Sequence, residues 1–174
     1  MAVERTLRGR VAVAGVGQTR YYKHGQAPVA ESRLTLEAIL NACADAGIAP
    51  EEIDGFSSYS NDRNDGPRLA AALGCRELRY SNMFWGGGGG GAAGAVQNAA
   101  AAIATGLADC VVAYGGLAQG QFGRFGRGAE VGVVSGEAAH TVPYGLMSAA
   151  QMFAMKAMRF MHDHRVGRPA LRAI

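Results

Sequence analysis

The sequence predicts an α/β fold, with a mostly parallel sheet and helices on both faces. Short apolar runs that end in glycine occur at 11–17 and 109–116, and each is typical of a strand buried on both faces. Segments with helical periodicity lie between the apolar runs, and this alternation favours parallel strands. Hydrophobic residues make up 49% of the 174 residues and charged residues 18%, as in a globular protein.

The first half of the chain supplies most of the predicted elements. After the strand at 11–17, Leu36, Ile39 and Cys43 mark one face of a helix from about residue 32 to 46, and Gly47 ends it. Further strands are expected at 56–59 and 80–84, with a short helix at 68–73 between them. The polar loop at 61–67 lacks the spacing of a calcium loop, so we expect a solvated loop and no metal site.

A run of six glycines, residues 86–91, follows the strand at 80–84. Each glycine inside a regular element costs about 0.5–1 kcal/mol relative to alanine, so the run indicates a strained turn or a close approach of another group. A small-residue helix is expected to follow, with Gly106 as its stop, and its first N–H groups offer an anion or oxyanion site. The alternative is a flexible linker.

The chain changes character after residue 114. Residues 115–136 are rich in glycine without a clean period, which is typical of a long functional or mobile excursion. A methionine-rich helix is expected from about Leu146 to Arg165, suited to adaptable packing or to a greasy acyl group. We therefore predict two parts, an α/β core at 1–114 and a loop segment at 115–174.

Charge and cysteine content exclude several classes of protein. A net charge of +3 is too small to indicate nucleic-acid binding, whereas a polyanionic coenzyme would fit it. Cys43, Cys75 and Cys110 are odd in number and far apart, so neither a disulfide framework nor a zinc site is indicated. The N-terminus lacks the apolar core of a signal peptide and no run is long enough to span a membrane, which predicts a cytoplasmic protein.

Several of these segments together resemble the thiolase superfamily, in its sterol-carrier or lipid-transfer branch. The resemblance rests on residues 11–17, Asp45–Ile48, Glu52–Gly55, Ile103–Gly116 and Pro143–Met147. It covers the N-terminal half of such a subunit. It implies a thiolase-like layered fold with a loop-domain excursion, and a homodimer that pairs the strand at 80–84 across a twofold axis.

The resemblance also implies a function. The family's nucleophilic cysteine falls at Gly89 in this sequence, and a glycine cannot carry an acyl group. This pattern resembles the thiolase-like aldolases, which implies a carbon–carbon lyase that cleaves a β-hydroxyacyl-CoA with a steroid or other bulky tail by a retro-aldol reaction. The coenzyme A thioester is then substrate and no bound cofactor is expected. The catalytic base is expected from a missing second half, and a DUF35/OB-fold protein as partner.

The expected site has two groups of residues. Gly89 marks the place of the missing nucleophile, and the backbone N–H groups of Gly90 and Gly91 polarise the thioester. The residues expected to bind substrate or coenzyme A are Trp85, Gly88, Arg124, Arg127, His140, Tyr144 and Met147.

Two other functions stay open at this point. One is a non-catalytic acyl-CoA-binding, lipid-binding or scaffold subunit. The other is an acetyl-CoA acyltransferase, an ordinary thiolase, whose nucleophile is Cys75 or Cys110 instead.

Overall fold

The computed structural model describes residues 7–59, 62–85, 90–122 and 134–173. The chain forms two compact units, Met1–Gln121 and Phe122–Ile174. The predicted boundary after residue 114 is not tested by this division and stays a prediction. No described helix is long and apolar enough to cross a membrane.

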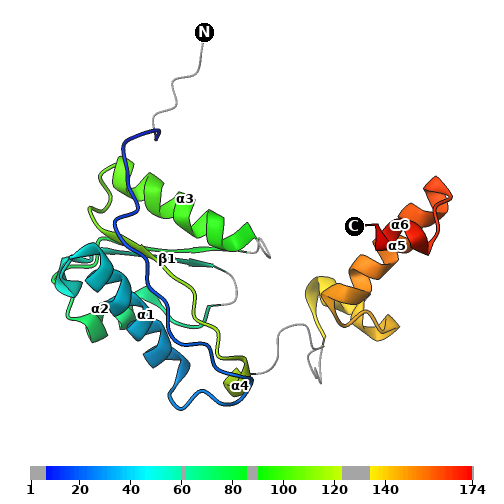
Figure 1. The fold of residues 1–174 in the computed structure, drawn as a ribbon, viewed down its shortest axis with the longest axis horizontal. Helices are drawn as coiled ribbons and strands as arrows, with labels where there is room; N and C mark the ends of the chain where they lie inside the picture. Colours follow the sequence, from blue (N-terminus) through cyan, green and yellow to red (C-terminus); the bar gives the residue numbers. More distant parts are fainter. Residues whose placement is uncertain (1–6, 60–61, 86–89, 123–133, 174) are drawn as a thin grey trace, which may run out of the picture. The chain divides into compact units, whose positions relative to one another are not determined.

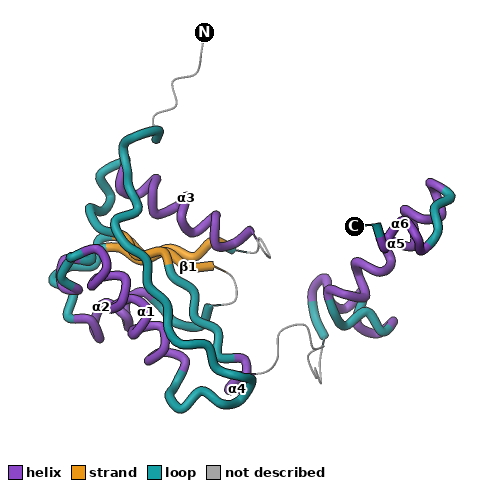
Figure 2. Tube along the Cα trace, in the orientation of Figure 1, coloured by secondary structure: helices purple, strands orange, loops and turns teal. Residues whose placement is uncertain are grey.

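The first unit contains a parallel sheet of three strands in the order β2-β1-β3, with β1 at Gly55–Tyr59, β2 at Tyr80–Phe84 and β3 at Val111–Ala113 (Figures 1 and 2). Gly55 pairs with Tyr80 on one side and with Val111 on the other. The predicted α/β class is therefore confirmed. Because β2 is an edge strand, the predicted dimer pairing has a free edge to use, but the dimer itself stays a prediction.

Helices cover both faces of this sheet. α1 (Glu31–Ala46) and α2 (Gly66–Leu73) lie on one face, where Phe56 packs with Ile39 and Leu69 in the core. α3 (Gly91–Ala104) lies on the other face, where the hydroxyl of Ser57 donates a hydrogen bond of 2.9 Å to the carbonyl oxygen of Ala95. Neighbouring strand residues thus point to opposite helical layers, as the pleat requires.

The ends of these helices follow their sequence. Gly47 and Gly74 adopt left-handed conformations after α1 and α2, and the Asp65 carboxylate accepts a hydrogen bond from the Arg68 backbone N–H at the start of α2. The predicted helix after the glycine run is confirmed as α3, and Gly106 follows it with φ +76°. Two further short elements are a 3-10 turn at Pro50–Glu52 and α4 at Gln119–Phe122, which lies at the boundary between the two units.

The predicted strand at 11–17 is wrong. This segment is extended but belongs to no sheet, and Val13 and Val16 expose 76% and 72% of their surface (Figure 1). Gly15 lies against α1, where a Cβ would be 2.6 Å from the carbonyl oxygen of Ala42. Its apolar residues match a buried strand, yet no described strand lies close enough to pair with it.

The second unit is helical. Its elements are 3-10 turns at Gly136–His140 and Val142–Tyr144, α5 at Ala149–His164 and α6 at Arg168–Arg172. α5 confirms the predicted methionine-rich helix but begins three residues later, because Ser148 and Gln151 form a capping box. Three of its methionines, Met152, Met155 and Met158, are exposed.

Candidate functional site

The carboxyl edge of the sheet gathers several of the residues that the sequence singled out. Parallel strands end at one edge, and ligands of open α/β sheets bind there. β1 ends at Tyr59, β2 is followed by Trp85, and α3 begins at Gly91. Trp85 exposes 86% of its surface. This edge is the candidate site.

Tyr59 is a residue of this edge that sequence reasoning missed. A Cβ on Gly91 would lie 2.8 Å from Cδ2 of Tyr59, and one on Gly115 would lie 2.9 Å from its Cε1. The aromatic ring therefore lies between the start of α3 and the residue that follows Tyr114. The available sequence signal was an aromatic residue at the end of a predicted strand, just before a polar loop.

The loop after β1 is fixed to the segment after β3 by polar contacts. The Asp62 carboxylate accepts hydrogen bonds of 2.7 Å from the backbone N–H of Asn64 and of 2.7 Å from that of Gly116. The Tyr114 hydroxyl donates to the Asn64 carbonyl oxygen at 2.5 Å. These contacts give the predicted solvated loop a structural role. Among the described residues, no group of three or more His, Cys, Asp or Glu side chains could hold a metal.

A buried carboxylate holds the next part of the same segment. Glu31 exposes 3% of its surface and pairs with Arg63 at 2.9 Å. It also accepts a hydrogen bond from the Ala118 backbone N–H, and its own N–H donates to Gln121. Residues 114–121 are thus tied to the N-terminus of α1 and to the loop after β1, which gives the candidate site a fixed wall.

Burial sets the ionisation of Tyr114. Desolvation raises the pKa of its phenol from 10.0 to about 12, with smaller contributions from Asp62 and Asp65. The neutral phenol is also the form that donates to Asn64. Its contribution to folding is therefore complete below pH 10, the unfolded pKa, and is lost as the pH rises through about 12.

We expect the Tyr114→Phe variant to lose less stability than the wild type between pH 10 and 12, because it has no phenol to ionise at this position. Chemical unfolding measured across this range, together with tyrosinate absorbance, checks the prediction. An identical pH dependence in wild type and Tyr114→Phe would contradict it.

The three thiols are poor nucleophiles. Desolvation raises the pKa of Cys43, Cys75 and Cys110, so each stays protonated at neutral pH. Cys75 also donates a hydrogen bond of 3.5 Å to the carbonyl oxygen of Pro50. None of these environments matches that of an activated cysteine.

The other predicted site residues lie in different parts of the chain. Trp85, Gly90 and Gly91 lie at the carboxyl edge of the sheet, and a Cβ placed on Gly90 would have no neighbour within 4 Å in the part of the chain that the structure describes. His140, Tyr144 and Met147 belong to the second unit, where Tyr144 exposes 82% of its surface. Gly88, Gly89, Arg124 and Arg127 lie outside the described residues. The roles of all these residues stay predictions.

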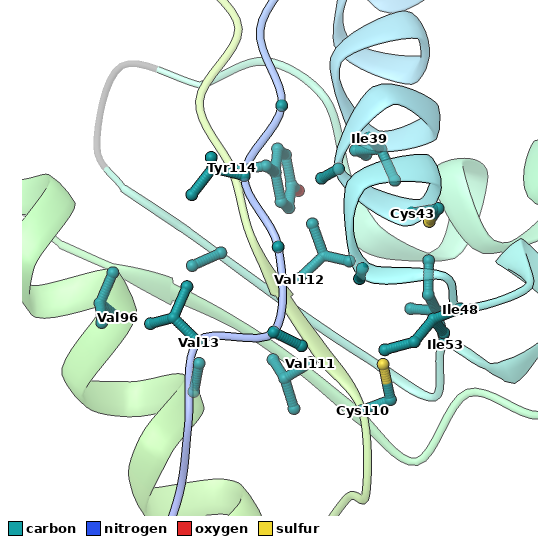
Figure 3. Close-up of a pocket in the computed structure, with 18 of the residues that line it drawn as sticks. Val13, Ile39, Cys43, Ile48, Ile53, Val96, Cys110, Val111, Val112 and Tyr114 are labelled. Carbon is teal, nitrogen blue, oxygen red and sulfur yellow. The ribbon is translucent and has the colours of Figure 1, made fainter.

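A cavity of about 560 Å³ lies elsewhere in the first unit (Figure 3). Residues 11–17 and 109–115 line it together with residues of α1 and α3, and Val13, Ile39, Val96 and Val112 are among its apolar side chains. Among the described residues, none of those predicted for the aldolase site lines it, whereas Cys110, a candidate nucleophile of the acyltransferase alternative, does. The cavity could not be predicted from the sequence, because it depends on the position of the segment at 11–17 in the folded chain.

Comparisons with known proteins point to one class of enzyme. The chain is 38% identical over 164 residues to a steroid side-chain-cleaving aldolase of Thermomonospora curvata, a match that covers 91% of this chain and 41% of that protein. It is also 38% identical over 162 residues to the 17-hydroxy-3-oxo-4-pregnene-20-carboxyl-CoA lyase of Mycobacterium tuberculosis, covering 90% and 41%. The chain thus spans about two fifths of the length of these relatives. It matches no protein-family model.

A solved structure has the same fold. One chain of the Ltp2-ChsH2(DUF35) aldolase superposes with a TM-score of 0.75 and 37% sequence identity, over 91% of this chain and 39% of that one. Aldolase and lyase are therefore the activities that these matches name.

The proteins that this chain matches differ from the predicted family. The expected membership in the thiolase superfamily, sterol-carrier type, is wrong, because the relatives are steroid side-chain-cleaving aldolases and a CoA lyase. The segments that carried the resemblance are mostly short apolar runs and glycine helix stops, and such local patterns occur in any parallel α/β core. The predicted function as a thiolase-like subunit with Gly89 in place of the nucleophile is corrected on the same ground, as is the acetyl-CoA acyltransferase alternative. The non-catalytic alternative has no support, since the relatives carry enzyme names.

Proposed function

We propose that this chain is part of a steroid side-chain-cleaving aldolase that works together with a partner protein. The observation that carries the proposal is the match of about nine tenths of the chain, at 38% identity, to two proteins named for this one reaction class. The partner is proposed from the solved structure, whose name joins two components.

The name of the lyase defines the chemistry that we propose for this chain. In a 17-hydroxy-3-oxo-4-pregnene-20-carboxyl-CoA, the hydroxyl on C17 is β to the thioester carbonyl. A base removes the proton of that hydroxyl, the C17–C20 bond breaks, and C17 becomes a ketone carbon. The electron pair of the broken bond forms a thioester enolate, which is reprotonated to an acyl-CoA. No oxidant and no bound cofactor is needed, and the coenzyme A thioester is the substrate.

The candidate site has groups that suit this chemistry. An enolate oxygen is stabilised by preorganised N–H donors, and we propose the backbone N–H groups of Gly90 and Gly91 for this role. Trp85, which is exposed at the end of β2, offers a flat apolar surface to a steroid ring system. We assign no base among the described residues.

The proposal is tested with 17-hydroxy-3-oxo-4-pregnene-20-carboxyl-CoA as substrate and the chain combined with a DUF35 partner protein. We expect the 17-ketosteroid and the acyl-CoA product to appear in equal amounts by mass spectrometry. The control substrate lacks the 17-hydroxyl and should not be cleaved, because it cannot form the ketone. Absence of cleavage, together with no binding of the substrate in a thermal-shift assay, would refute the proposal.

A further inference from the structure

The ring of Tyr59 lies between two glycines that are distant from it in the sequence. A Cβ on Gly91 would lie 2.8 Å from Cδ2 and 3.1 Å from Cβ of Tyr59, and one on Gly115 would lie 2.9 Å from Cε1 and 3.0 Å from the hydroxyl oxygen. Neither glycine has a positive φ, so their backbone conformations would accept a side chain. The space that the ring occupies is therefore what excludes a side chain at both positions.

α3 is held against β1 at two points on the same face of the sheet. The Ser57 hydroxyl donates to the Ala95 carbonyl oxygen at 2.9 Å, and two residues further along β1 the Tyr59 ring meets Gly91. Two strand residues span about 6.6 Å and four helix residues about 6 Å, so both contacts fit a helix that runs antiparallel to β1. The ring thus fixes where the first residue of α3 lies relative to the end of the strand.

Hydrogen bonds hold the segment on the other side of the ring. The Asp62 N–H donates to the Tyr59 carbonyl oxygen at 2.9 Å, and the Asp62 carboxylate accepts from the N–H of Gly116 at 2.7 Å. The residue before Gly115 is fixed as well, because the Tyr114 N–H donates to a carbonyl oxygen of β1 at 2.9 Å. Gly115 therefore cannot move away from the ring unless these bonds break.

The described contacts of the Tyr59 side chain are those of its ring. Tyr59 is half-buried, and its hydroxyl forms no hydrogen bond with another residue in the part of the chain that the structure describes. The shape of the ring, and not its hydroxyl, is what separates Gly91 from Gly115. Phenylalanine has the same ring and should serve in its place.

We propose that Tyr59 is a positioning residue of the lyase site. Its ring sets the separation between the start of α3 and the segment after β3, which are two sides of the candidate site. The inference rests on the proposed function, but Tyr59 acts through Gly91 and Gly115 and needs no contact with the substrate. A displacement of about 1 Å at a site can slow a reaction about a hundredfold, so loss of the ring should affect kcat more than substrate binding.

Substitution of Tyr59 in the chain combined with the DUF35 partner tests this role. With 17-hydroxy-3-oxo-4-pregnene-20-carboxyl-CoA as substrate, we expect Tyr59→Leu to lower kcat at least about tenfold and to change KM less than about threefold. Tyr59→Phe keeps the ring and should recover most of the lost kcat. Ile39→Val, in the core on the opposite face of the sheet, is the control for a general loss of stability and should lower Tm without this fall in kcat.

A double-substitution cycle shows whether the ring itself is responsible. Leucine lacks the three atoms of Tyr59 that lie nearest to the Cβ position of Gly115, which are Cε1, Cζ and the hydroxyl oxygen. Gly115→Ala should therefore lower kcat at least about tenfold in the wild type, and less than about twofold when Tyr59→Leu is already present. Equal effects of Gly115→Ala in the two backgrounds would overturn the proposal.

Amide hydrogen exchange gives a readout that does not depend on catalysis. The N–H groups of Ala95 and Val96 close the first turns of α3. We expect them to exchange at least about tenfold faster in Tyr59→Leu than in the wild type or in Tyr59→Phe. Unchanged exchange would overturn the proposal, and so would faster exchange with an unchanged kcat, because Tyr59 would then be a packing residue only. Absence of cleavage by the wild type would count against the proposed function, and the exchange rates would still decide whether Tyr59 sets the start of α3.

Discussion

Replacement of Asp54 by alanine is expected to lower the free energy of unfolding by about 3–5 kcal/mol. The Asp54 carboxylate, largely buried before β1, accepts hydrogen bonds from the backbone N–H of Asp109 at 2.9 Å and of Cys110 at 2.8 Å. It also pairs with Arg79 at 3.3 Å. Alanine would leave both N–H groups without this acceptor and would remove one of the two carboxylates that hold Arg79, the other being Asp109 at 2.7 Å. The starts of β1, β2 and β3 would lose their common anchor.

Chemical denaturation of the variant measures this loss. The matched control is Asp45→Ala, since the Asp45 carboxylate accepts a single backbone hydrogen bond at an exposed position, and there we expect less than about 1 kcal/mol. The loss of unfolding free energy in Asp54→Asn should lie between the losses in these two variants. The amide oxygen of asparagine can still accept a hydrogen bond, but its NH₂ group faces N–H donors. Equal losses for Asp54→Ala and Asp45→Ala would show that Asp54 is not such an anchor.

The parts of this fold that follow local rules could be predicted from the sequence. α1 ends at Gly47 and α3 lies between the glycine run and Gly106, because helix periodicity and left-handed glycines are encoded within a few residues. β1 and β2 were also predicted from the sequence, because their patterns lie within a few consecutive residues. The role of Asp54 was not found, since it depends on three segments that meet only in the folded chain.

The segment at 11–17 marks where local pattern fails. Its run of valine and alanine is typical of a buried strand, but a strand forms only when a neighbour pairs with it. Within the described residues β3 lies across a cavity from it, and the backbone stays unpaired. The family resemblance failed in a similar way, because it rested on segments whose pattern reports burial and helix ends and not chemistry.

The candidate site was predicted only in outline. Trp85, Gly90 and Gly91 do lie at the carboxyl edge, since the chain order of strands and helices fixes which segments follow each strand. Tyr59 was missed because its importance lies in a contact with Gly91 and Gly115, which are distant in sequence.

The glycines around the start of α3 are expected to fall into two classes. Packing against β2 requires a glycine at Gly94, whereas neither packing nor backbone geometry requires one at Gly90. A Cβ on Gly94 would lie 2.5 Å from Cδ2 of Phe84, so a side chain there forces α3 away from β2. We expect Gly94→Val to cost about 2–3 kcal/mol in unfolding free energy, from overpacking and the stiff β-branched side chain. Thermal and chemical unfolding measure this cost.

Gly90→Ala is the matched control from the other class. Gly90 has φ −86°, which alanine adopts without strain, and no atom of the described residues lies within 4 Å of its Cβ position. We therefore expect its unfolding free energy to stay within about 0.5 kcal/mol of the wild type. A glycine that neither packing nor backbone geometry requires points to a group from outside the described residues that approaches it. Loss of lyase activity in a fully stable Gly90→Ala protein would identify that group as substrate, whereas a destabilised Gly90→Ala protein would place Gly90 with Gly94 among the packing glycines.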